Sequence, residues 1–191
     1  MRGKEKQNGI RTALRIILPI ACLLWIAFIL GNSLRTGEQS SEQSATVVEA
    51  VQRVAKVIAP ESKIANATGD TYDRLHSVVR ACAHAGEFAV LGALLCWCYF
   101  AYTSKLTYFY FPVIFLLLFP TIDECLQGFV SGRSGELIDL ILDTSGGLIG
   151  LLLATLSVAI GVLIYERRTR KGKAKTVQNS QKRAPCMRIN Y

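Results

Sequence analysis

The chain has 191 residues, of which 51% are hydrophobic, and its mean hydropathy is +0.31. This composition excludes an ordinary soluble globular domain and indicates several membrane spans. The formal net charge is +8, and the placement of the charges is more informative than their sum. The six cysteines are scattered without a C-x-x-C pair, which gives little support to a zinc centre or a redox motif.

Four apolar runs predict four membrane-spanning helices, because each is long enough to cross about 30 Å of hydrocarbon as a helix. The predicted fold class is therefore an all-α membrane protein, a bundle of four transmembrane helices with an amphipathic extracellular loop helix. We expect a basic tail over 1–13, the transmembrane domain over 14–165 and a second basic tail over 166–191. The spans are expected at about 14–31, 81–102, 108–126 and 137–165.

The long polar segment 32–80, between the first two spans, is expected to be extracellular. Its apolar residues recur at helical spacing from Ala45 to Ile58, which predicts an amphipathic helix on the membrane surface or against the spans. Pro60 ends this helix. The positions expected to be buried are Val47, Val51, Val54 and Ile58.

The basic residues are distributed unevenly along the chain. Most of the 22 Lys and Arg residues lie in the two tails, whereas those of the segment 32–80 are matched by acidic residues. The positive-inside rule therefore places both termini in the cytoplasm, as in a multi-pass protein of the cell membrane. The tails fit an anchor beside anionic membrane lipids and need no nucleic-acid partner.

Polar and charged residues interrupt the apolar sequence at the predicted outer ends of three spans. Carboxylates at this depth are costly to bury, so they need partners or a function. Helical spacing places Arg80, His84 and Glu87 on one face of their helix. The sequence predicts an outward-facing functional pocket that contains Arg80, His84, Glu87, Asp123, Glu124, Gln127, Arg133, Asp139 and Asp143.

A structural interpretation of the same residues stays open. Glu136 and Asp139 fall in the first turn of a helix, where a carboxylate meets the helix dipole favourably. An ion-pair network would join Arg80 with Glu87, or Arg133 with Asp139. Close helix packing, rather than chemistry, is expected at three glycines, Gly146, Gly147 and Gly150.

Two stretches resemble motifs of the VanZ-like family. DECLQGFVSGRSGELIDLILDTSGGLIG, residues 123–150, is similar to the signature D-E-x-x-Q-x-F, x-x-x-R and D-x-x-x-(N or D)-x-x-G-x-x-x-G. VRACAHAGEFAVLG, residues 79–92, is similar to a second motif with a basic residue, His and Leu-Gly. The resemblance covers about residues 14–164. It implies a multi-pass membrane protein acting at the cell envelope, in a family named for teicoplanin resistance in Gram-positive bacteria.

The first functional hypothesis is a pocket that binds or positions an envelope ligand, a lipid headgroup or a peptidoglycan precursor, and contributes to glycopeptide resistance. Arg80 and Arg133 would face phosphate, since arginine engages phosphate through paired hydrogen bonds. We expect no cofactor and no resident metal. The alternative is a metal-assisted membrane hydrolase or transferase acting on lipid-linked phosphate, so catalysis stays open. A third interpretation, a transporter, requires a homo-oligomer, because four spans leave little room for alternating access.

Overall fold

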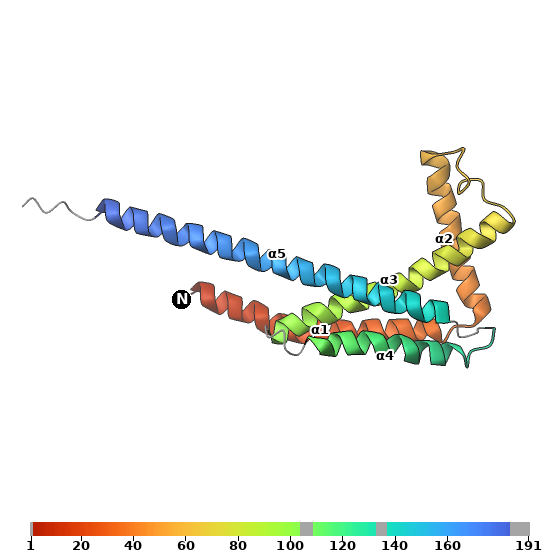
Figure 1. Ribbon diagram of the computed structural model, residues 1–191, viewed down its shortest axis with the longest axis horizontal. Helices are drawn as coiled ribbons and strands as arrows, with labels where there is room; N and C mark the ends of the chain where they lie inside the picture. The colour runs from red at the N-terminus through yellow and green to blue at the C-terminus, as the bar shows by residue number, and fades with distance from the viewer. Residues whose placement is uncertain (1, 104–108, 133–136, 184–191) are drawn as a thin grey trace, which may run out of the picture. The chain divides into compact units, whose positions relative to one another are not determined.

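The structure, a computed structural model, describes residues 2–103, 109–132 and 137–183. These residues form helices and contain no strand, which confirms the predicted all-α class (Figure 1). The chain divides into two compact units, Met1–Ala154 and Thr155–Tyr191. The helices are α1 (Arg2–Ser33), α2 (Gly37–Ile58), α3 (Asp70–Tyr102), α4 (Tyr110–Gln127) and α5 (Leu137–Arg183).

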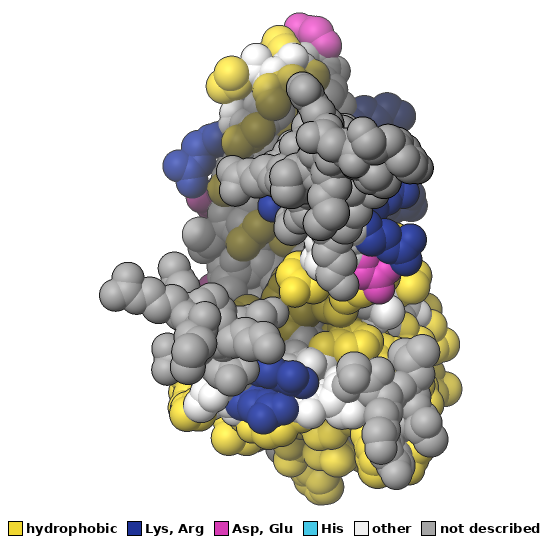
Figure 2. All heavy atoms as spheres, turned by 90° about the vertical axis from the view of Figure 1, so that its left-hand side faces the viewer, with side chains coloured by type: hydrophobic (Ala, Val, Ile, Leu, Met, Phe, Trp, Pro, Cys, Tyr) yellow, Lys and Arg dark blue, Asp and Glu magenta, His cyan; other side chains and the backbone are white. Residues whose placement is uncertain are grey.

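Four of the helices are long and apolar enough to cross a membrane, so this is a multi-pass membrane protein. Their surfaces expose many large hydrophobic side chains, among them Leu23 and Leu24, each 67% exposed. Figure 2 shows hydrophobic side chains over much of the viewed face. Such a surface would drive association in water but is suited to lipid. The candidate spans are Gly9–Ser33, Asp70–Tyr102, Tyr110–Gln127 and Leu137–Lys171.

The core of the first unit draws one or more side chains from each of the four candidate spans. Ile29 of α1, Phe88 of α3 and Leu116 of α4 are fully buried in one cluster. Leu151 of α5 belongs to the same cluster. The four spans therefore pack around a common apolar centre.

Small residues let α3 and α5 approach closely within this unit. A Cβ atom at Gly146 would overlap the carbonyl oxygen of Ala85, and one at Gly150 would overlap that of Ala89. On the opposite helix, a Cβ atom at Gly92 would overlap the carbonyl oxygen of Gly147. The two backbones are thus in direct contact, as in other membrane helix pairs built on small residues.

The loop helix α2 begins earlier than expected and buries a different face. Thr36 caps it in a reciprocal capping box with Gln39, so the helix begins at Gly37 rather than Ala45. Its buried side chains are Ser40, Ser44 and Val48. The short serines allow α2 to lie close to α3, which leaves the stripe of larger apolar residues beside the contact. Burial of Val47, Val54 and Ile58 against other helices is therefore wrong, whereas Val51 is half-buried.

We predict that Gly150→Ala destabilises the protein and that Gly161→Ala does not. The methyl group at position 150 would overlap backbone atoms of Ala89, and overpacking of this kind costs about 1–3 kcal/mol. At Gly161 an added Cβ meets nothing within 4 Å, and alanine is the better helix former. Thermal unfolding of both variants in the same detergent measures the difference. Equal unfolding temperatures would contradict direct contact between α3 and α5.

Candidate functional site

Two carboxyl groups lie inside the first unit. Asp123 of α4 has 0% of its surface exposed, and Asp143 of α5 has 1%. A carboxylate removed from water is costly unless it is hydrogen-bonded or paired, and more so in a membrane protein. These two residues therefore define the centre of the candidate site.

Asp123 is held by neutral donors from two helices. The Ser33 hydroxyl, at the end of α1, donates to Asp123 Oδ1. The Gln127 side-chain amide, one turn further along α4, donates to Oδ2 at 2.9 Å. The Ser33 hydroxyl also lies 3.0 Å from the carbonyl oxygen of Ile29, one turn earlier in α1. Asp123 thus ties the end of α1 to the end of α4.

Asp143 lies among other acids and is incompletely satisfied. Its Oδ1 atom is buried and has no hydrogen-bond partner among the described residues. It follows the first turn of α5 and precedes Gly146, where that helix begins its contact with α3. Among the described residues, the carboxyls that act on it electrostatically come from three helices and are Asp123, Asp139, Glu124 and Glu87. We call these five residues the carboxyl cluster.

Glu87 connects the cluster to α1. The Asn32 side-chain amide donates to Glu87 Oε1 at 2.8 Å. The indole N–H of Trp25 donates to the backbone carbonyl of Glu87, also at 2.8 Å. Asn32 is the residue before Ser33, so neighbouring residues of α1 hold Glu87 on α3 and Asp123 on α4.

Sequence reasoning missed Trp25, Asn32 and Ser33. A signal for them exists in the spacing, because Trp25 and Asn32 are two helical turns apart and therefore face the same neighbour. The expected span ended at residue 31, one residue before Asn32.

A cleft of about 90 Å³ lies between α1, α2 and α3 and shares Glu87 with the carboxyl cluster. Its lining includes a guanidinium, an imidazole, a carboxyl, two amides and two hydroxyls. Arg80 is exposed at the cleft, whereas His84 and Glu87 are half-buried. The polar lining residues are Asn32, Ser40, Gln43, Ser44, Arg80, His84 and Glu87. This volume admits a small polar group, since a water molecule needs only about 10–15 Å³ on such a scale.

The connection that follows α4 is held against the start of α2. The backbone N–H of Gly37 donates to the carbonyl of Ser131 at 3.2 Å. Gly132 adopts φ +76°, a conformation that favours glycine, and a Cβ at Gly37 would overlap its carbonyl oxygen. The described part of this connection ends at Gly132. Arg133, the expected partner of phosphate, and Glu136 lie outside the described residues.

The structure brings most of the predicted site residues into two adjoining groups. Arg80, His84 and Glu87 line the cleft. Glu87 also belongs to the carboxyl cluster, together with Glu124, Asp139, Asp123 and Asp143. Gln127 donates a hydrogen bond to Asp123. Across the described ranges, no group of three His, Cys, Asp or Glu side chains is arranged to hold a metal ion. The metal-dependent alternative therefore has no support from this geometry.

We predict that Ser33→Ala destabilises the protein by about 1–3 kcal/mol. The change removes a donor from a buried carboxyl oxygen, and an unsatisfied buried acceptor costs free energy in this range. Ser41→Ala is the matched control, because the Ser41 hydroxyl makes only an exposed contact of 3.4 Å with His76. Thermal unfolding in detergent compares the two variants. Equal stability of the Ser33→Ala and Ser41→Ala proteins would show that the hydrogen bond between Ser33 and Asp123 contributes nothing to the free energy of unfolding.

Comparison with known protein families gives a match over most of the chain. The model of a family described as VanZ/LLP1 matches residues 18–165. The matched range contains the cleft, the carboxyl cluster and the glycines of the α3–α5 contact. No curated protein and no solved structure matches the chain.

Proposed function

The chain belongs to the VanZ/LLP1 family, and from this premise we propose that it binds or positions a cell-envelope ligand in an outward-facing polar pocket. The observation that carries the proposal is the cleft between α1, α2 and α3, where Arg80, His84 and Glu87 of one helix face lie beside amides and hydroxyls of two others. The ligand is a lipid headgroup or a peptidoglycan precursor. Its binding contributes to resistance to teicoplanin-type antibiotics.

The lining of the cleft suits a phosphate-bearing headgroup. Arg80 is exposed there, so its guanidinium is available for paired hydrogen bonds with phosphate oxygens. Asn32 and Gln43 offer amide donors and acceptors, which fit sugar or peptide groups attached to the phosphate. The volume of about 90 Å³ admits a group of the size of a phosphate, and the rest of the molecule stays outside the cleft.

The carboxyl cluster holds the wall of the pocket in place. The bond between Ser33 and Asp123 fixes the end of α1, and the residue before Ser33 is Asn32 of the cleft. Asn32 in turn fixes the side chain of Glu87. Preorganised polar groups bind a ligand more tightly because they lose less conformational entropy on binding. The cluster acts as a positioning element, and the ligand contacts are made by the cleft.

We place the pocket on the extracellular side, with both termini in the cytoplasm. The excess of Lys and Arg in the two tails supports this orientation. In a cysteine-free background, a cysteine at Ser41 should react with an impermeant thiol reagent in intact cells. A cysteine at Lys173 should react only after the membrane is opened. Reaction at Lys173 from outside would overturn the orientation and with it the outward-facing pocket.

We predict that Arg80→Gln abolishes ligand-dependent resistance without changing stability. Arg80 is exposed, so its replacement should alter the free energy of unfolding by no more than about 0.5 kcal/mol. Arg74→Gln, on the same helix and outside the cleft lining, is the matched control. Teicoplanin susceptibility is measured in cells that contain equal amounts of each variant.

The result expected is full resistance with Arg74→Gln and sensitivity with Arg80→Gln, at equal unfolding temperatures. Full resistance with both variants would refute the cleft as the ligand site. Sensitivity accompanied by a lower unfolding temperature of Arg80→Gln would instead assign the residue a structural role.

A further inference from the structure

The second unit, Thr155–Tyr191, contains a basic surface outside the pocket. Within it α5 is uncharged as far as Ile164, and the helix then continues without a break through a highly basic stretch to Arg183. Tyr165 marks the change and is 60% exposed, as is usual for a tyrosine at the boundary between hydrocarbon and headgroups. Every side chain from Tyr165 to Lys171 is exposed.

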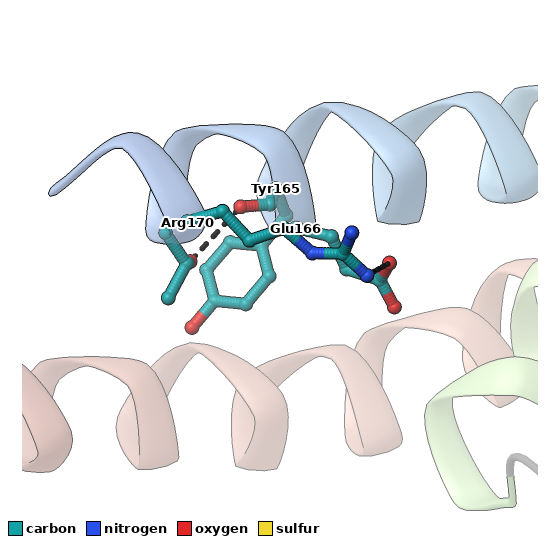
Figure 3. Close-up of polar contacts among 4 residues, drawn as sticks. Tyr165, Glu166 and Arg170 are labelled. Atoms are coloured by element: carbon teal, nitrogen blue, oxygen red, sulfur yellow. Dashed lines mark hydrogen bonds and ion pairs between the residues drawn. The ribbon is translucent and has the colours of Figure 1, made fainter. Parts of the chain in front are cut away.

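The acid of this stretch is paired on one face of the helix. Glu166 forms an ion pair with Arg170, one turn away, with 3.9 Å between the carboxylate oxygen and the guanidinium nitrogen (Figure 3). The Thr169 hydroxyl donates to the carbonyl of Tyr165 at 2.9 Å. Between Glu166 and Arg183 the sequence has no other acidic residue. The charge of Glu166 is therefore directed at Arg170.

Three further cations lie in the first two helical turns after Tyr165, besides the paired Arg170. At about 100° per residue, Arg167, Lys171 and Arg168 fall within one arc of about 100° of the helix. Arg167 borders Arg170 at the edge of this arc, and Glu166 lies outside it. All three are exposed. A surface of this kind has three positive charges and no acidic residue of its own.

We propose that Arg167, Arg168 and Lys171 form a docking surface for the anionic headgroups of the leaflet from which α5 emerges. The argument is charge complementarity at short range. At about 1.5 Å of rise per residue, Lys171 lies about 9 Å along the helix axis from Tyr165, and Arg183 lies about 27 Å from it. The Debye length at physiological ionic strength is about 8 Å. Arg167 and Arg168 lie within this distance of Tyr165 and Lys171 lies at its limit, whereas Arg183 is screened.

The same stretch is unsuited to the other ways in which a helix binds a membrane. Between Glu166 and Arg183 its only apolar side chains are Ala174 and Val177, so it lacks the apolar stripe of an interfacial helix. Attraction to the leaflet is therefore electrostatic, selective for anionic headgroups and sensitive to salt. Nucleic acid would also be attracted by such charges, but the three cations lie in the last turns of the candidate span Leu137–Lys171.

The experiment uses the whole protein reconstituted in phosphatidylcholine vesicles that contain a trace of spin-labelled lipid. The measured quantity is the association of spin-labelled phosphatidylglycerol relative to that of spin-labelled phosphatidylcholine. The test variant is Arg167→Gln/Arg168→Gln/Lys171→Gln. The matched control, Lys175→Gln/Lys182→Gln/Arg183→Gln, removes the same charge further along the helix.

We expect the wild-type protein and the control to prefer phosphatidylglycerol, and the test variant to lose at least about fivefold of this preference, the effect of one near-surface cation. High salt should abolish the preference in the wild type. An undiminished preference in the test variant would overturn the proposal, as would an equal loss in the control, which would indicate attraction by the tail as a whole. A labelled oligonucleotide that binds the wild type and not the test variant, without any lipid preference, would assign the surface to nucleic acid instead.

Discussion

The structure depends on the burial of Asp123 inside a membrane protein. A carboxyl group with 0% of its surface exposed requires donors, and Ser33 of α1 and Gln127 of α4 supply them. This requirement fixes the ends of two helices that are far apart in sequence. The neighbouring residue Asn32 then bonds to Glu87, which brings α3 into the same arrangement. The polar wall of the cleft is thus a consequence of satisfying one buried acid.

The close approach of α3 and α5 adds the second buried acid to this arrangement. Gly146 and Gly150 bring α5 against the backbone of Ala85 and Ala89, which lie in the same turns of α3 as Glu87 but on another face. Asp143, one turn before the first glycine contact, is consequently carried to the other carboxyls. The helix contact and the buried acid therefore lie in neighbouring turns of α5. A substitution at Gly146 or Gly150 will also change the electrostatic environment of Asp143.

The amino-acid pattern was sufficient to predict the helical class, four apolar helices of membrane length and the family, because uninterrupted apolar runs are strong local signals. Charges within these runs pointed to Asp123 and Asp143, which the structure buries, and their function stays a prediction. The pattern did not identify Ser33 or Asn32, since short polar residues at the end of a span are equally typical of a loop. The face of α2 was mispredicted for a related reason. Counting apolar residues favours Val47 and Ile58, whereas the contact with α3 is made where Ser40 and Ser44 permit close approach.

The two proposed binding surfaces rely on different physics. At the cleft, Glu87 is held by Asn32 and Trp25, so the positions of polar groups are fixed and can discriminate between ligands by shape. On the basic face of α5, long exposed side chains meet a fluid layer of headgroups, where the density of charge matters and its exact arrangement does not. Arg15 shows the contrast within the chain, because its Nε donates to the carbonyl of Ala101 and its guanidinium lies over the Tyr102 ring. A cation tied in this way contributes to helix packing, whereas Arg167 and Arg168 remain available to lipid. Ligand recognition and membrane attachment are therefore expected to vary independently.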